Sequence, residues 1–383
     1  MAAWRARRDV VVLLVMGILA AALGGCSSGP LAGLKWSDQT PSWTPNGREI
    51  VFASNRAHPK SQIARLYVMN ADGTGVRRLT RGDLDAREPS FSPDGKWVVY
   101  AAHVLRASGL VTDASAIDLI SANGSKVRFL TPRLRDADGP TWSPDGRWIA
   151  FVNTVNPTAN LNLPPPRDDL YVVRPGGGDL HRVVTDVGAW TWSPDGSEIA
   201  FQGANGDIYG ASVDAAAPVA KPLGFGHGDI TDIAWLPDGS KIAFASGKDV
   251  GTYIPDVTQR YLWILDLRGR KERRLRALTD ELSVEGPGTP WSSVTLTWLR
   301  GRTPTLAVFD GDNTDVVSIG GVKQHSIKTP SKGFLLDGSA SPDGKSLLLV
   351  VRRSGSSEGH GPPSAIFVGS VDGGHAHQLT QRG

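Results

Sequence analysis

Cysteine, methionine and helical periodicity are scarce in this chain of 383 residues, which contains one Cys and three Met. A single cysteine, Cys26, excludes an internal disulfide. No apolar pattern with the period of a helix is sustained anywhere, whereas Gly (45) and Pro (26) are plentiful. This combination is typical of many short strands joined by turns. The length allows either two average domains or one large all-β domain.

A strong excess of one charge is also missing. The whole chain carries a formal charge of +3, and loss of the first 25 residues would remove three Arg and one Asp. That loss leaves 41 − 3 = 38 basic and 38 − 1 = 37 acidic residues, a net charge of +1. Neither a basic stripe nor an arginine-rich tail is present, so we expect no nucleic-acid partner.

The N-terminus has the organisation of an export signal. Arg5, Arg7 and Arg8 precede an apolar run of 13 residues, 10–22, which is short for a membrane span and suits the apolar region of a signal peptide. The sequence Leu-Gly-Gly-Cys that ends at Cys26 resembles the bacterial lipobox, whose Cys is diacylated and becomes the mature N-terminus. An ordinary cleaved signal with an incidental Cys is the alternative. The Arg7-Arg8 pair leaves the twin-arginine route open beside the general secretory route.

We therefore expect residues 1–25 to be a lipoprotein signal peptide and residues 26–39 to be a tether. Acylation of Cys26 also accounts for a free thiol in an exported protein. Two or three acyl chains give stable membrane anchoring. The expected location is the cell membrane, with the rest of the chain on its extracytoplasmic side.

One pattern occurs seven times between residue 40 and the C-terminus. "TWSPDGRWIAF" starts at Thr141 and "TWSPDGSEIAF" starts at Thr191. The other copies start at Ser42, Ser90, Ala234, Thr297 and Ser339, and successive copies are 42–63 residues apart. The sixth copy lacks Pro-Asp-Gly, and the seventh has Ala340 where the others have an aromatic residue.

Turn chemistry explains the pattern. Ser-Pro-Asp-Gly suits a type I turn followed by a left-handed glycine, and the β-branched and aromatic run after it suits a strand. Each copy is followed by a looser pattern with a second Gly-containing turn, such as "RLYVMNADGTGVRRLT" at 65–80. One repeat is therefore four antiparallel strands, which we call a, b, c and d. Units of 40–50 residues repeated four to eight times predict a β-propeller.

We therefore predict an all-β fold in which residues 40–383 form a propeller of seven four-stranded blades. Six blades remain an alternative if the sixth copy is absorbed into a neighbour. The quoted repeat resembles that of the TolB-type propellers, relatives of the WD-repeat fold. The resemblance implies a propeller but not one function, because similar repeats build the propellers of peptidases and of other envelope proteins. TolB has six blades behind a small α/β domain, so its partner-binding residues are not carried over to this chain.

The repeat also predicts which face is functional. Tight a–b and c–d turns share one face, and long b–c and d–a connections share the other, namely 103–115, 154–168, 247–260, 280–294 and 353–364. Long loops in a compact repeat are usually functional or disordered. By residue type, the candidates there for anchoring a partner are Arg106, Tyr253, Arg260 and Trp291. Flexible surface without a partner is the alternative for each loop.

Strand a is expected to enter the central channel three residues before each motif aromatic. These seven positions are Thr40, Glu88, Gly139, Ala189, Asp232, Thr295 and Asp337. Glu88, Asp232 and Asp337 predict a mildly acidic channel mouth that could also contact a partner.

Motifs that resemble catalytic or metal sites have simpler explanations. Residues 355–359 match G-x-S-x-G but lack the strand and helix of a nucleophile elbow. His375 and His377 have no third ligand, and the acidic stretch 310–315 lacks the Gly and Glu of a calcium loop. We therefore expect no catalytic residue, cofactor or metal.

The favoured function is a lipid-anchored, non-catalytic scaffold for an envelope protein or a cell-wall component. The alternatives are a small-ligand or polysaccharide binder, or a propeller enzyme, that uses the channel mouth. A purely structural accessory to export or envelope assembly is a weaker option. Histidine converging with acids at the mouth would favour the enzyme or small-ligand binder, but none of the seven channel positions is a His.

Overall fold

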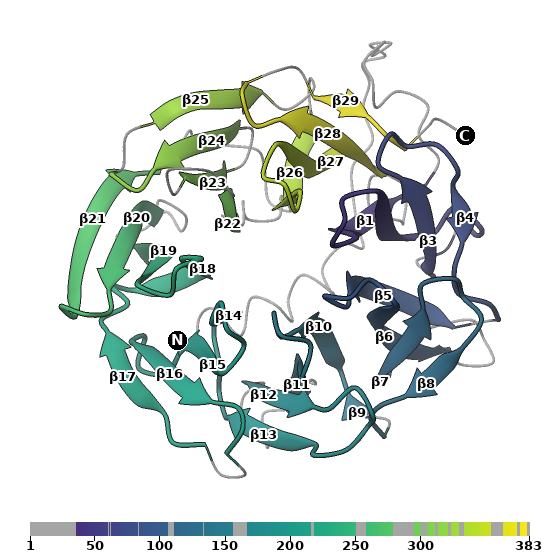
Figure 1. Cartoon of the computed structure of the whole chain (residues 1–383), viewed down its shortest axis with the longest axis horizontal. Coiled ribbons are helices and arrows are strands. Elements are labelled where there is room, and N and C mark those ends of the chain that lie inside the picture. Colours follow the sequence, from purple (N-terminus) through teal and green to yellow (C-terminus); the bar gives the residue numbers. More distant parts are fainter. Residues whose placement is uncertain are drawn as a thin grey trace, which may run out of the picture.

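Seven antiparallel sheets surround a central channel in the computed structural model of the chain (Figure 1). The structure describes residues 36–59, 61, 63–82, 84–105, 111–132, 134–155, 167–215, 218–249, 258–278, 295–299, 305–310, 313–320, 323–328, 333–353, 363–373 and 376–380. The prediction of a seven-bladed propeller is confirmed, and the sixth repeat forms a blade of its own. Among the described residues, no helix is long and apolar enough to cross a membrane; the apolar run 10–22 lies outside them.

The strands follow one another around the ring in chain order, and the blades are numbered in that order. Blade 1 contains β1 (Asp38–Trp43), β2 (Glu49–Ser54), β3 (Arg65–Asn70) and β4 (Arg77–Arg78). Blade 2 contains β5 (Asp85–Phe91), β6 (Trp97–Leu105), β7 (Val111–Ser121) and β8 (Val127–Phe129), and β9 (Leu134–Arg135) pairs with β7. Blade 3 contains β10 (Ala137–Trp142), β11 (Ile149–Val155), β12 (Arg167–Val173) and β13 (His181–Val184).

The remaining four blades repeat the order. Blade 4 contains β14 (Trp190–Trp192), β15 (Glu198–Gln202), β16 (Ile208–Ser212) and β17 (Lys221–Gly224). Blade 5 contains β18 (Asp229–Trp235), β19 (Lys241–Asp249), β20 (Thr258–Asp266) and β21 (Lys271–Ala277). Blade 6 contains β22 (Thr295–Leu299), β23 (Thr305–Asp310), β24 (Asn313–Ser318) and β25 (Lys323–Lys328). Blade 7 contains β26 (Gly333–Ala340), β27 (Ser346–Arg353), β28 (Ser364–Ser370) and β29 (His377–Gln378).

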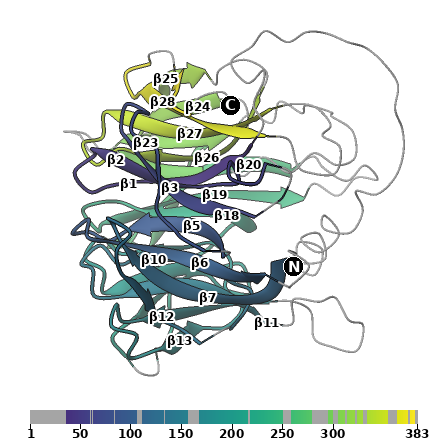
Figure 2. The same ribbon diagram turned by 90° about the vertical axis from the view of Figure 1, so that its right-hand side faces the viewer.

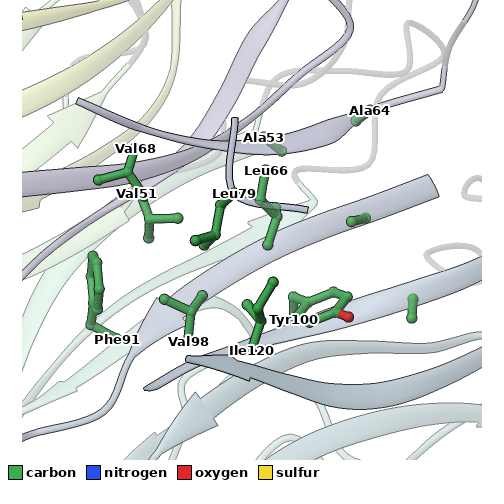
Figure 3. Packing of buried hydrophobic residues seen from close by; sticks show 12 residues of the cluster. Val51, Ala53, Ala64, Leu66, Val68, Leu79, Phe91, Val98, Tyr100 and Ile120 are labelled. Atoms are coloured by element: carbon green, nitrogen blue, oxygen red, sulfur yellow. The ribbon is translucent and has the colours of Figure 1, made fainter. Parts of the chain in front are cut away.

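Apolar packing between neighbouring blades forms the core. Between blades 1 and 2, Val51, Leu66 and Val68 face Val98 and Ile120 (Figure 3), and all five side chains are buried. The phenylalanine of the Ile-Ala-Phe motif pairs with an aromatic residue of strand c. Phe151 pairs with Tyr171, for example, and their rings stack with centroids 5.7 Å apart. A blade buries both faces only between two neighbours, which is why the repeats close into a ring.

The ring closes without strand exchange, because every blade is a continuous stretch of sequence. Strand β1 of blade 1 contacts β26, β27 and β28 of blade 7. The buried hydroxyl of Ser364 donates a hydrogen bond of 2.8 Å to the carbonyl of Asp38, and Phe52, Met69, Leu348 and Ile366 pack in one buried cluster. Packing and hydrogen bonds, rather than a shared sheet, therefore hold the first blade to the last.

The Ser-Pro-Asp-Gly turns are held by their own side chains. In blade 3, the hydroxyl of Ser143 donates to Asp145 (2.6 Å) and accepts from the backbone N–H of Trp148 (2.9 Å). Gly146 has a φ of 72°, which favours glycine. The same bond from Ser to Asp recurs in blades 2, 4 and 7. These turns also touch one another: a β-carbon added at Gly95 would lie 3.5 Å from Pro45, and one at Gly146 would lie 3.7 Å from Pro93.

Candidate functional site

The a–b and c–d turns lie on one face of the disc, which we call the turn face, and the b–c and d–a connections lie on the other, the loop face (Figure 2). On the loop face the strands extend further than the sequence predicts. Strands β6 and β7 include residues 103–105 and 111–115 of the expected loop 103–115. Strands β11 and β12 likewise extend into the expected loop 154–168, and strands β19 and β20 extend into the expected loop 247–260. Residues 156–166 connect β11 to β12, and residues 250–257 connect β19 to β20. Both segments lie outside the described residues.

The predicted channel positions coincide with irregularities in strand a. The pairing of strands a and b shifts register around Thr40, Glu88 and Gly139, and all three residues have φ between 45° and 63°. Further shifts occur directly before Asp232 and Asp337. A bulge bends a strand and re-aims its side chains. The innermost strands of blades 1, 2, 3, 5 and 7 therefore all bend at this level.

Two of the channel acids tie their blade to the next one. The carboxylate of Glu88 in blade 2 accepts a hydrogen bond of 2.5 Å from the N–H of Gly139 in blade 3. Asp232 in blade 5 accepts a hydrogen bond of 2.6 Å from the N–H of Leu296 in blade 6 and one of 2.8 Å from the N–H of its own neighbour Ile233. Asp337 in blade 7 accepts 2.7 Å from Gly338. In blade 1 the residue that corresponds to the donor Leu296 is Pro41, which has no N–H to donate, and the residue that corresponds to the donor Gly139 is Thr40.

These acids are half-buried and hold protons more tightly than exposed carboxylates do. Burial raises the pKa of Asp232 to about 7, against the hydrogen bonds that it accepts, and the charge of Asp337 adds to the rise. Burial also raises the pKa of Asp337 to about 6. The pKa of Glu88 is raised by burial and by the neighbouring charge of Asp138. The expected acidic mouth is therefore partly protonated near neutral pH.

A histidine joins the acids between blades 2 and 3. Nε2 of His103, at the end of β6, lies 3.1 Å from a carboxylate oxygen of Asp138, and the His103 side chain is only 8% exposed. Burial lowers the pKa of His103, but the hydrogen bond and charge of Asp138 outweigh it and leave the pKa raised. Burial and the charge of Asp138 raise the pKa of Asp136 to about 6. His103, Asp136, Asp138 and Glu88 thus lie together at the loop face and influence one another's pKa, and we call them the His103 cluster.

The His103 cluster changes one expectation. The seven channel positions contain no His, yet folding brings His103 from strand b to the acids of the neighbouring blade. Its sequence signal is weak, because His103 lies 12 residues after the motif aromatic Phe91 and is not part of the repeat. No group of three or more His, Cys, Asp or Glu in the described part of the chain is arranged to hold a metal ion.

The other candidates fall into two groups. Cys26, Arg106, Tyr253 and Trp291 lie outside the described residues. Arg260 is described, and only 8% of it is exposed within β20, where Cα pairing places it beside Gly247. Such burial offers little surface to a partner in this conformation, and the role of Arg260 as a partner anchor stays a prediction.

Comparison with known proteins agrees with the repeat. Residues 35–164 match the model of the TolB beta propeller domain, and residues 220–249 match a WD domain, G-beta repeat. The predicted resemblance to TolB-type propellers is confirmed by these matches. The first covers about a third of the chain, and the structure extends the same architecture over all seven blades.

Individual relatives have different names. The chain is 26% identical over 162 residues to an uncharacterized peptidase, YuxL, of Bacillus subtilis, covering 35% of this chain and 24% of that protein. It is 32% identical over 108 residues to the Tol-Pal system protein TolB of Gluconobacter oxydans, covering 27% of this chain and 22% of that protein. The chain thus spans about a quarter of the length of these two relatives. A solved oligogalacturonate lyase in complex with manganese has a TM-score of 0.60 at 14% identity, covering 88% of this chain and 90% of the lyase, which shows the fold alone.

Proposed function

We propose that this chain is a lipid-anchored, extracytoplasmic propeller that binds an envelope protein or a cell-wall component through its loop face, without catalysis. The observation that carries the proposal is the difference between the two faces. On the turn face, turns with matched side chains repeat from blade to blade. On the loop face, the connections differ in length and the channel acids and the His103 cluster break the repeat.

The anchor fits this orientation. Strand β1 begins at Asp38 on the loop face, so the chain enters the disc from that side. Only 11 residues separate Cys26 from Asp38, and a fully extended chain spans about 3.3–3.6 Å per residue. The loop face would therefore be held within about 40 Å of the membrane. A membrane-bound or membrane-proximal partner would meet this face first.

Crosslinking in intact cells, followed by purification of the anchored chain from membranes, tests the proposal. Residues 156–166 and 250–257 would each be replaced by a Gly-Ser linker, which leaves the strands β11, β12, β19 and β20 intact. We expect the crosslinked partner to be lost. Arg147→Ala on the turn face is the control, because Arg147 is half exposed and lies on the opposite side of the disc. Recovery of the same partner from the linker variants would refute the face assignment.

The anchor has a separate test. Cys26→Ala is expected to release the protein from the membrane fraction and to remove the mass of the acyl chains. Unchanged membrane association and unchanged electrophoretic mobility would contradict lipidation at Cys26.

A second candidate function is supported by the His103 cluster: a small-ligand site, or an enzyme site, at the channel mouth. A buried imidazole beside carboxylates of raised pKa is an arrangement that acid–base chemistry uses. Three relatives of this chain are also named as peptidases. His103→Gln separates the two candidates: it should leave partner crosslinking unchanged if the scaffold proposal holds, and it should abolish any ligand binding or turnover at the mouth.

A further inference from the structure

The seam between blade 7 and blade 1 carries a cleft on the turn face. A cleft with a volume of about 770 Å³ opens there, between the a–b turns of both blades and the ends of β28 and β29. It lies on the opposite face from the loops, so it is separate from the site proposed above. The residues at two equivalent positions differ between this seam and several others.

The first comparison concerns one residue of strand d, the one that pairs with the third residue from the end of strand c. In blade 1 this residue is Arg77, whose guanidinium donates a hydrogen bond of 3.0 Å to the carbonyl of Ala122 in blade 2. In blade 5 it is Arg273, whose guanidinium donates a hydrogen bond of 3.2 Å to the carbonyl of Ile319 in blade 6. In blade 6 it is His325, whose imidazole contacts the carbonyl of Val371 in blade 7. Each of these carbonyls belongs to the residue that directly follows strand c.

The same positions in blades 7 and 1 are His377 and Ala71. Both line the cleft, and no hydrogen bond joins them in the described part of the structure. The link made at the seams 1–2, 5–6 and 6–7 is therefore not made at the seam that closes the ring, and among the described residues the equivalent Arg128, Arg182 and Lys221 do not make it at the seams 2–3, 3–4 and 4–5 either.

The second comparison concerns the residue two positions after the turn glycine. In blade 3 this is Trp148, which is 2% exposed and crosses the seam to donate 2.9 Å to Asp214 of blade 4. Blade 2 also has a tryptophan, Trp97, at this position. Blade 7 has Ser346, which lines the cleft and is too short to cross it. A small residue where other blades carry a large one leaves the space open.

The lining of the cleft indicates the chemistry of its ligand. Trp43 provides a flat aromatic surface, and its Nε1 is buried without a hydrogen-bond partner among the described residues. Hydroxyls of Ser346 and Ser370 and the imidazole of His377 offer both donors and acceptors. Lys345, Asp343 and Asp372 also line the cleft and together carry a formal charge of −1. An aromatic surface surrounded by a few neutral polar groups suits a ligand with many hydroxyls and an apolar ring face.

We propose that the cleft between blades 7 and 1 on the turn face binds a short neutral oligosaccharide, with one sugar ring against Trp43. This site goes beyond the proposed scaffold function and needs no contact with the loop face. A protein held at the membrane by one face and binding glycan by the other would connect two layers of the envelope.

Titration of the purified full-length chain with chitotriose, cellotriose and maltotriose tests the site. The readouts are tryptophan fluorescence and saturation-transfer NMR. We expect saturable binding of at least one of the three sugars. Ser346→Trp, which copies blades 2 and 3, should weaken that binding about tenfold or more by filling the cleft. Glu198→Trp, at the same position of blade 4, is the matched control and should bind like the unmodified chain.

Further variants distinguish loss of the sugar site from loss of folding. Trp43→Phe retains an aromatic ring and should bind more weakly with a smaller fluorescence change, because the indole is gone. Ser346→Gln narrows the cleft with less bulk if Ser346→Trp lowers the Tm. The Gly-Ser linker variants of the loop face should bind sugar normally, so failure of the scaffold proposal leaves this test unaffected. Absence of binding to all three sugars, capture of peptides instead, or equal binding by a folded Ser346→Trp variant would overturn the proposal.

Discussion

The carboxylate of Glu88 accepts a hydrogen bond of 2.5 Å from the backbone N–H of Gly139, which joins the equivalent channel positions of blades 2 and 3. Asp232 makes a similar inter-blade bond between blades 5 and 6, where the donor is the N–H of Leu296, the residue after the channel position Thr295. Acidic residues at these positions therefore serve the architecture as well as the surface charge of the channel mouth. The two roles can be separated by mutation, because Asp337 has no such inter-blade bond among the described residues.

Asp337→Asn should stabilise the protein at neutral pH. The folded pKa of Asp337 is raised to about 6 by burial, from an ordinary value of 3.8, so the native state binds the proton more tightly than the unfolded state does. The contribution of this group to stability consequently falls as the pH rises from about 4 to about 6, and stays low above that. The substituted amide does not ionise, so this loss of stability with rising pH disappears, and its oxygen can still accept the hydrogen bond from the N–H of Gly338. We expect a gain of about 1–2 kcal/mol at pH near 8 and a flatter dependence of Tm on pH.

Asp232→Asn is the contrasting variant. Both of its carboxylate oxygens accept backbone hydrogen bonds, and the amide nitrogen cannot replace the acceptor for Leu296 or Ile233. The gain from removing a buried charge is therefore offset by an unsatisfied N–H. A thermal unfolding series in which Asp232→Asn stabilises as much as Asp337→Asn would show that the inter-blade bond is unimportant.

Ser143→Ala should destabilise the protein by about 1–2 kcal/mol. The fully buried hydroxyl donates to Asp145 and accepts from the N–H of Trp148, so its loss leaves the N–H of Trp148 without that acceptor. Urea unfolding measures the cost. Thr231→Ala is a milder comparison, because its hydroxyl makes one bond of 3.3 Å to a backbone carbonyl and is only half-buried. Equal effects of the two changes would argue against the special role of the Ser-Asp pair.

Gly146→Ala should cost about 1–2 kcal/mol because of its backbone rather than its surroundings. A β-carbon there would meet only Pro93 at an ordinary 3.7 Å, but the φ of 72° disfavours any residue with a side chain. Gly176→Ala provides the control, since a β-carbon at Gly176 meets nothing within 4 Å and its φ is not in the left-handed region. Differential scanning calorimetry should therefore show a lower Tm for the first variant only.

Ser364→Ala should weaken the closure of the ring. Its hydroxyl donates a hydrogen bond to the carbonyl of Asp38, 326 residues away in the chain, at the seam where the last blade meets the first. We expect a loss of about 1 kcal/mol and faster hydrogen exchange in β1 and β28 than in the other blades. Uniform exchange across all seven blades would indicate that this seam opens no more easily than the rest.

The repeat was sufficient to predict the blades, the tight turns and the channel positions. Each of these depends on contacts within one repeat or on the same contact made seven times, so the pattern in "WSPDG" and "IAF" is direct evidence of them. The register shifts around Glu88 and directly before Asp232 and Asp337 fall at positions that the aromatic residues predict to enter the central channel, but the sequence did not predict the shifts themselves. The loops were predicted less well, because strand pairing extends beyond the residues of the repeat, as it does at Arg260.

What the sequence by itself determined is the periodic part of this protein: seven units and two kinds of face. Only the tertiary structure decided which features break that period. His103 meets Asp138 across two blades, and Ser346 opens a cleft at the one seam where the last blade meets the first. Both arise between residues that are distant in sequence, and a side chain carries no local signal of which neighbour the closing ring will bring to it.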